Sequence, residues 1–174
     1  KSVAFITGAG RRIGRHLAIR FAERGWRVVV HYGSSADGAR ATLAEIESLG
    51  GEGMLVQADV RNSQEITGAV ERAAERFGRI DLLINNAGIY PPAVPLEDVT
   101  EELWREVLET NLYGEFFTAQ AVARVMSRQD SGGRIVNLAS LGAFQIWRDR
   151  LPYNVSKAGV VQLTRALARA LAPK

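Results

Sequence analysis

The sequence contains no cysteine, and only three of its 22 basic residues are lysines. The absence of cysteine excludes a disulfide framework and a thiolate metal site, so we predict no metal centre and expect a cytoplasmic protein. No apolar run approaches the length of about 20 residues with which a helix crosses a bilayer. We therefore expect no membrane partner.

Charge of one sign is not concentrated anywhere in the chain, although the net charge is +3 and the sequence pI is about 9.6. Basic and acidic residues alternate, as in Glu71, Arg72, Glu75 and Arg76, and no basic block is interleaved with aromatic residues. Such a pattern is typical of solvated helix faces and not of a nucleic-acid surface. Single arginines remain available for a local phosphate site.

Short apolar runs alternate strictly with amphipathic segments along the chain. The runs at 1–7, 27–32, 53–58, 80–84 and 134–139 predict strands. The segments at 13–24, 36–49, 63–77, 100–127 and 151–171 predict helices, with a bend near Gly114 in the longest. Strands that are apolar throughout are buried on both faces, which is typical of a parallel sheet. We predict an α/β fold, a doubly wound, Rossmann-type sheet covered by helices on both faces, in a single domain over residues 1–174.

Three glycines, Gly8, Gly10 and Gly14, lie between the first predicted strand and the first helix. The dinucleotide fingerprint spaces its glycines two and three residues apart, whereas the second gap here is four. Gly8 would permit a tight turn, Gly10 a close approach of the pyrophosphate, and Gly14 close packing of helix on strand. The helix N-terminus offers free N–H groups to phosphates, so we predict a dinucleotide site, with a plain glycine turn as the alternative.

The end of the second strand indicates which dinucleotide binds. Enzymes that use NAD usually carry an acid there for the ribose 2′-hydroxyl, but the first acid in this chain is Asp37, inside the next helix. Arg12 and the hydroxyls of Ser34 and Ser35 would favour a 2′-phosphate. We therefore predict NADP(H) as the cofactor.

Two further strand ends carry polar or small residues. Asp59 follows the third strand, where it would contact the adenine or cap the next helix. Asn85-Asn86-Ala87-Gly88 follows the fourth, where small residues would leave room for the ribose and nicotinamide or form a plain turn. The carboxyl ends of parallel strands meet at one edge, so both segments are expected beside the glycine turn.

A proton donor is expected next to this edge. Tyr153 and Lys157 stand four residues apart, which places them on one helix face, and the lysine ammonium would favour the phenolate form of the tyrosine. Ser140 would orient a substrate oxygen. Asn111 would anchor a water that connects Lys157 to solvent, or would be a polar residue at a helix bend.

These motifs together resemble the short-chain dehydrogenase/reductase family over essentially the whole chain. The resemblance implies a catalytic tetrad of Asn111, Ser140, Tyr153 and Lys157, with Lys157 also holding the nicotinamide ribose. The cofactor contacts that we predict are Gly8, Gly10, Arg11, Arg12, Ile13, Gly14, His31, Tyr32, Ser34, Ser35, Asp59, Val60, Asn86, Ala87, Gly88, Tyr153 and Lys157.

Two departures from the family pattern qualify this resemblance. Arg12 replaces a glycine of the usual turn and, with His31-Tyr32, resembles the pteridine reductase branch. That branch commonly carries Asp at the position of Ser140, so the catalytic half resembles 3-oxoacyl-carrier-protein reductases instead. Members of the family are also longer, and the resemblance implies that the chain is truncated, without the last strands and the substrate loop.

The sequence thus supports three functions. The first is NADPH-dependent reduction of a ketone or 3-oxoacyl thioester to the alcohol, with Tyr153 as proton donor and a small carbonyl compound as substrate. The second is a pteridine reductase, and the third is a non-catalytic NADP(H) sensor. The resemblance also implies a homodimer or homotetramer formed through the 100–127 segment and the last helix, where Leu163, Leu167 and Leu171 share a face.

Overall fold

The computed structural model describes residues 1–172 and contains one parallel sheet of five strands. The strands follow the order β3-β2-β1-β4-β5 across the sheet. Strands are added on one side of β1 up to β3 and on its other side from β4 onward, so the strand order reverses between β1 and β4. Their bounds are β1 (Val3–Ile6), β2 (Arg27–Tyr32), β3 (Glu52–Gln57), β4 (Leu82–Asn85) and β5 (Arg134–Asn137). This topology confirms the predicted doubly wound sheet.

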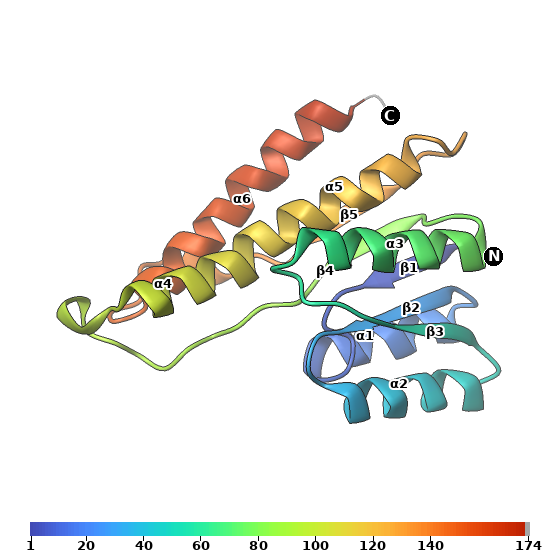
Figure 1. Ribbon diagram of the computed structural model, residues 1–174, viewed down its shortest axis with the longest axis horizontal. Helices are drawn as coiled ribbons and strands as arrows, with labels where there is room; N and C mark the ends of the chain where they lie inside the picture. Colours follow the sequence, from blue (N-terminus) through green and yellow to red (C-terminus); the bar gives the residue numbers. More distant parts are fainter. Residues whose placement is uncertain (173–174) are drawn as a thin grey trace.

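Helices cover both faces of the sheet (Figure 1). One face carries α1 (Arg12–Glu23) and α2 (Ala36–Ser48); the other carries α3 (Ser63–Phe77), α5 (Gly114–Met126) and α6 (Leu151–Leu171). Two short 3-10 turns, η1 (Leu96–Asp98) and η3 (Leu141–Ala143), lie in the connections. No helix among residues 1–172 has the length and apolar character needed to span a membrane.

The core consists of two apolar layers, one on each side of the sheet. Val3 and Phe5 of β1 pack toward α3 and α5, while Ala4 and Ile6 pack toward α1 and α2. Successive side chains of a strand point to opposite faces, which is why β1 needs apolar residues at every position.

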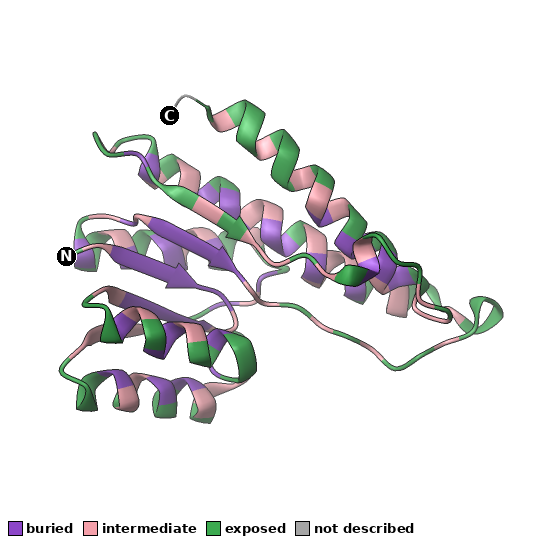
Figure 2. Cartoon of the chain, turned by 180° about the vertical axis from the view of Figure 1, so that it is seen from behind, coloured by how far each residue is buried: buried purple, intermediate pink, exposed green. Residues whose placement is uncertain are grey.

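The expectation that every strand is buried was wrong for β5. Its residues alternate between exposed and half-buried, and Val136 is 47% exposed (Figure 2). The reason is its position, because β5 pairs only with β4 and forms an edge of the sheet in the described residues. The apolar pattern of a strand in the sequence does not show whether the strand has one neighbouring strand or two.

The long helix expected over 100–127 is divided into three parts. α4 (Glu101–Leu108) leads into η2 (Glu109–Tyr113), a π-helical turn, and α5 follows without a break in direction. Gly114 is required by packing, because a Cβ there would lie 2.9 Å from the Cβ of Val60. The irregularity therefore precedes the glycine, and the glycine lets α5 approach the end of β3.

The last helix is packed mainly through its first half. That half lies against α4, η2 and η3, whereas residues beyond Val160 are mostly half-buried or exposed (Figure 2). Leu163, Leu167 and Leu171 are each half-buried, and the oligomer contact expected there stays a prediction.

Candidate active site

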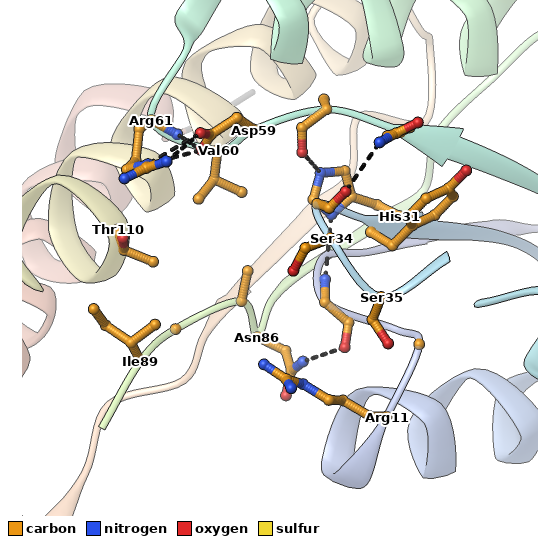
Figure 3. A pocket seen from close by; sticks show the side chains of 18 of the residues that line it. Arg11, His31, Ser34, Ser35, Asp59, Val60, Arg61, Asn86, Ile89 and Thr110 are labelled. Atoms are coloured by element: carbon orange, nitrogen blue, oxygen red, sulfur yellow. Dashed lines mark hydrogen bonds and ion pairs between the residues drawn. The ribbon is translucent and has the colours of Figure 1, made fainter. Parts of the chain in front are cut away.

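A cavity of about 820 Å³ lies at the carboxyl ends of β1 to β4 (Figure 3). All of the expected cofactor residues except Gly14, Tyr153 and Lys157 line it. The cavity also contains residues that the sequence did not single out, namely Gly33, Gln57, Ala58, Arg61, Glu65, Ile89, Glu106 and Thr110. The place is the one where open α/β sheets bind ligands, at the reversal of strand order.

The glycine turn is closely packed, and its glycines leave no room for side chains. Gly8 has φ +64°, and a Cβ at Gly14 would lie 2.3 Å from the carbonyl oxygen of Gly8, so neither tolerates a side chain. A Cβ at Gly10 would lie 3.0 Å from the Ser35 carbonyl oxygen, which shows that Gly10 lets the turn meet the start of α2. The first turn of α1 has no acidic residue and no side-chain cap, so its N–H groups are available to an anion.

Arg12 adopts φ +48°, a conformation that favours glycine. A non-glycine residue in the left-handed region costs about 1–2 kcal/mol, because its Cβ crowds the following carbonyl oxygen. The departure from the family pattern at this position is therefore a backbone strain as well as an added charge. Such a strain suggests that the guanidinium has a use at the cavity.

His31 lines the cavity, but both of its ring nitrogens form hydrogen bonds with the protein backbone. Its side chain is 1% exposed, Nδ1 accepts from the Gly8 N–H at 3.2 Å, and Nε2 donates to the Ala58 carbonyl at 3.0 Å. Desolvation by burial lowers the pKa of His31 to about 4, so the ring is neutral at pH 7. The geometry gives His31 the role of fixing the glycine turn to the end of β3. Its predicted contact with the cofactor stays a prediction.

Thr7 and Asn86 join the ends of β1 and β4. The Thr7 hydroxyl accepts from the backbone N–H groups of Asn86 and Ala87, both at 2.9 Å. The Asn86 amide donates to the carbonyl oxygens of Thr7 at 2.8 Å and Gly8 at 3.2 Å. The segment after β4 is thus fixed by side-chain bonds to the glycine turn and is more than a plain turn.

Asp59 does not cap α3, which removes that alternative. The cap is Asn62, whose side chain accepts from the N–H groups of Gln64 and Glu65. The Asp59 carboxylate instead pairs with the guanidinium of Arg61, with a shortest N–O distance of 2.6 Å. The hydrogen bonds from Arg61 lower the pKa of Asp59, so the rim of the cavity carries a closed ion pair.

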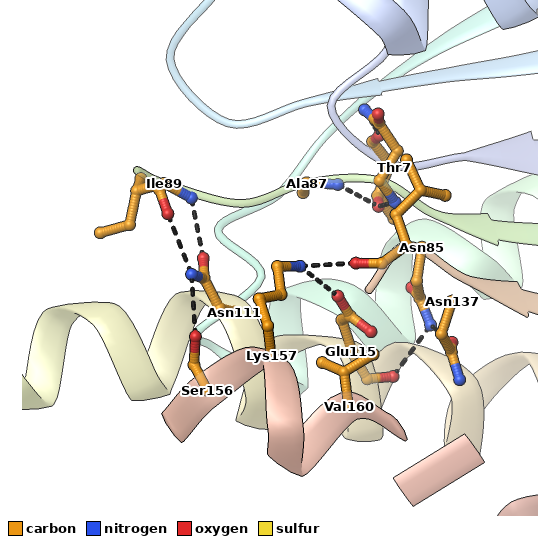
Figure 4. A network of polar contacts seen from close by, with 12 residues as sticks. Thr7, Asn85, Ala87, Ile89, Asn111, Glu115, Asn137, Ser156, Lys157 and Val160 are labelled. Atoms are coloured by element: carbon orange, nitrogen blue, oxygen red, sulfur yellow. Dashed lines mark hydrogen bonds and ion pairs between the residues drawn. The ribbon is translucent and has the colours of Figure 1, made fainter. Parts of the chain in front are cut away.

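Asn111 lies in the π-helical turn and is fully buried (Figure 4). Its Oδ1 accepts from the Ile89 N–H at 2.8 Å, and its Nδ2 donates to the Ile89 carbonyl at 2.9 Å and to the Ser156 hydroxyl at 3.2 Å. Both amide hydrogens are therefore engaged. The side chain fixes the loop after β4 to α6, which supports a positioning role; anchorage of a water stays a prediction.

Lys157 extends from α6 into the interior, toward the end of β4 (Figure 4). Its ammonium donates to the Leu138 carbonyl at 2.6 Å and lies 3.3 Å from Oε1 of Glu115. A Cβ at Gly88 would lie 3.9 Å from Nζ and 3.2 Å from Oδ1 of Asn111. Gly88 lines the cavity, and the absence of a side chain there leaves its backbone next to the Asn111 and Lys157 side chains.

Tyr153 is surrounded by aromatic residues. The ring of Trp147 stacks on it at 6.2 Å with an interplanar angle of 7°, and the ring of Tyr90 meets it edge-on at 4.7 Å. A Cβ at Gly142 would lie 3.4 Å from a ring atom of Tyr153, so η3 packs directly against it. Ser140 starts η3 and accepts from the Gly142 N–H at 3.1 Å, which leaves its own hydroxyl hydrogen free to donate.

Comparison with known proteins adds sequence relatives. A family model described as short chain dehydrogenase matches residues 2–174. The 3-oxoacyl-[acyl-carrier-protein] reductase of Synechocystis is 39% identical over 172 residues, which are 99% of this chain and 69% of that protein. The 3-oxoacyl-[acyl-carrier-protein] reductase FabG of Staphylococcus epidermidis is also 39% identical, over 98% of this chain and 69% of its own length.

Solved structures of similar proteins agree in fold. Carveol dehydrogenase from Mycobacterium avium, in complex with NAD, superposes with a TM-score of 0.95 at 28% identity, over 99% of this chain and 66% of that one. NAD+-bound xylitol dehydrogenase gives a TM-score of 0.95 at 32% identity, over 99% of this chain and 65% of that one.

Proposed function

Because the chain belongs to the short-chain dehydrogenase/reductase family, we propose that it is an oxidoreductase that uses NADP(H) to reduce a ketone or a 3-oxoacyl thioester to the alcohol. The observation that carries the proposal is the junction at Gly88. Gly88 lines the cavity and lies next to the buried ammonium of Lys157, one helical turn beyond Tyr153. A binding module would need the cavity but not the ammonium and the phenol beside it.

The residues have separate tasks in this proposal. The residues of the glycine turn and of the segment after β4 would hold the dinucleotide, which when bound would supply the hydride that reduces the substrate carbonyl. Tyr153 donates a proton to the oxygen, and the Lys157 ammonium stabilises the phenolate that remains. Ser140 donates a hydrogen bond to the same oxygen and orients the carbonyl. Asn111 bonds to the backbone of Ile89 and to Ser156 of α6, and so fixes the loop after β4 relative to the helix that carries Tyr153 and Lys157.

The charges around the cavity support NADP(H) over NAD(H). Arg11, Arg12, Ser34 and Ser35 line the cavity near the end of β2. The first acid after β2, Asp37, lies outside the cavity and pairs with Arg40 at 2.5 Å. A 2′-phosphate would therefore meet guanidinium and hydroxyl groups and no free carboxylate from this segment.

The first prediction concerns Arg12. We expect Arg12→Gly to weaken NADPH binding about 30-fold, since a charge-assisted hydrogen bond is lost, while NADH binding changes less than about 3-fold. The free energy of unfolding should stay equal or rise by up to about 1 kcal/mol. The strain energy relieved at the positive φ is at least as large as the entropy that glycine adds to the unfolded chain. Fluorescence titration and urea unfolding measure the two effects.

The matched control is Asp149→Gly. Asp149 is the other non-glycine residue with positive φ (+57°) among residues 1–172, and it does not line the cavity. This variant should show the same trend in stability with no change in NADPH affinity. Equal losses of NADPH and NADH affinity in Arg12→Gly would contradict the assignment of Arg12 to the 2′-phosphate.

A pteridine reductase remains the second candidate, because Arg12 occupies the glycine turn. NADPH oxidation with an acetoacetyl thioester and with a dihydropterin, side by side, tests the choice. We expect the thioester to turn over faster; faster pterin turnover would reverse the ranking, and no turnover with any carbonyl compound would favour the non-catalytic sensor.

A further inference from the structure

Glu115 on α5 is the only buried carboxylate among residues 1–172, and the proposed reaction does not yet use it. Its side chain is 2% exposed, and Oε1 lies 3.3 Å from Nζ of Lys157. Its second oxygen, Oε2, has no hydrogen-bond partner. Figure 4 shows Glu115 and Asn111 on either side of Lys157, deep in the same network.

An ionised carboxylate in the interior needs a countercharge, because the energy lost on leaving water is large. Among residues 1–172, Lys157 is the only cation paired with Glu115, so the two charges are coupled. Burial raises the pKa of the Glu115 carboxyl to about 7, against the opposing effect of the ammonium. The carboxylate therefore changes charge in the neutral range, beside the group that stabilises the phenolate of Tyr153.

Few other titratable groups lie on the elements next to this pair. α6 carries Tyr153, and η2 carries the half-exposed Glu109 and the exposed Tyr113. The buried residues of α3 are apolar, and β4 contributes the amide of Asn85. Lys157 lies one helical turn after Tyr153 on α6, so its ion pair with Glu115 is the charged pair that this inference relates to the tyrosine.

We propose that Glu115 is a positioning residue of the reaction, whose carboxylate neutralises the buried Lys157 ammonium and thereby keeps the Tyr153 proton on the phenol at neutral and alkaline pH. This inference rests on the proposed function. With Glu115 ionised, the pair has no net charge, and it stabilises the phenolate less than the Lys157 ammonium alone would. With Glu115 protonated, the pair carries one positive charge and favours the phenolate.

The consequence is that the charge of Glu115 affects carbonyl reduction and alcohol oxidation in opposite ways. Reduction of a carbonyl needs the proton on Tyr153, whereas oxidation of an alcohol needs the phenolate to accept one. An ionised Glu115 therefore extends reduction to higher pH and delays oxidation to higher pH. Both effects have the same origin and must move together.

Glu115→Gln tests this, because the amide keeps the shape and can still accept from Lys157. We expect the alkaline fall of ketone reduction and the rise of alcohol oxidation both to move to lower pH, by about one unit. Rates at the respective optima should stay within a few-fold. Glu115→Asp retains the charge, so its pH profiles should lie at least halfway back toward those of the unmodified protein. Glu71→Gln, on the exposed face of α3, should leave both pH profiles where they are.

Two results would overturn the inference. If rates fell while both pH profiles kept their positions, Glu115 would serve structure alone. If both profiles moved to higher pH, its task would be to keep Lys157 charged and not to hold the proton on Tyr153.

A readout without catalysis separates this inference from the proposed function. The sequence has three lysines, of which only Lys157 is known to lie in the interior, so carbon-13 NMR of labelled lysine side chains can follow Lys157 directly. Its signal should shift with an inflection near pH 7 that Glu115→Gln removes. With that inflection and no turnover, the proposed function fails alone; without it, the inference fails even in an active enzyme.

Discussion

Tyr153→Phe should lower kcat for carbonyl reduction by about 1,000-fold or more while changing NADPH affinity less than about 3-fold. The loss follows from removing the only proton donor in the proposed site, since general acid catalysis contributes about 100- to 10,000-fold. The ring itself is retained, so the contacts with Trp147 and Tyr90 that hold it should survive. Steady-state rates and fluorescence titration of NADPH measure the two quantities.

Tyr113→Phe is the matched control, because Tyr113 is 54% exposed on η2 and has no assigned task. It should leave both quantities unchanged. Turnover retained within about 10-fold in Tyr153→Phe would remove the acid from the mechanism, and a proton from water would have to be considered instead. A large loss of NADPH affinity would show that the hydroxyl serves binding.

Acid should weaken the fold through His31. The pKa of His31 is lowered from 6.5 to about 4, so the unfolded chain binds the proton more readily between these values. The stability that the neutral ring contributes is complete above pH 6.5 and lost as the pH falls to 4. A shift of this size is worth about 3 kcal/mol in the free energy of unfolding.

Glu115 has the opposite sign and masks this effect in the unmodified protein. Its pKa is raised to about 7, so the folded state takes up a proton first, and stability increases as the pH falls from 7 toward 4.5. The quantity to measure is therefore the difference in unfolding free energy between the unmodified protein and His31→Gln, by urea titration at several pH values. That difference should shrink by about 3 kcal/mol from pH 7 to pH 4.

His16→Gln is the control for this experiment, since His16 is exposed on α1. A difference for His31→Gln that stays constant with pH would mean that burial does not lower the pKa of the His31 ring. Loss of the bond from Gly8 would also be expected to loosen the cavity at low pH.

Much of the fold was accessible from the sequence because each step had a local cause. Alternating apolar runs predicted the strands, and the glycines at 8, 10 and 14 marked the turn between β1 and α1. The exposure of β5 had no local cause, since it depends on which strands lie beside it. The division of the 100–127 segment was also missed, because a π-helical turn keeps the composition of a helix.

The site was accessible in part for the same reason. Side chains whose type and spacing indicate a task, such as Tyr153 with Lys157, could be predicted from the sequence. Residues that act through a contact distant in sequence could not, and Thr7 and Glu115 belong to this group. His31 was predicted as a cofactor contact from its place at the end of β2. The structure adds that the side chain is buried and that both ring nitrogens bond to the backbone.

The π-helical turn has a consequence for insertions and deletions. An α-helix advances about 100° per residue, so removing one residue from 109–113 to restore regular winding would rotate all of α5 by about that angle. Glu115 would turn away from Lys157, and Gly114 would no longer face Val60. Substitutions on the exposed faces of α4 and α5 should be tolerated, whereas any change in the length of this segment should disconnect the buried carboxylate from the site.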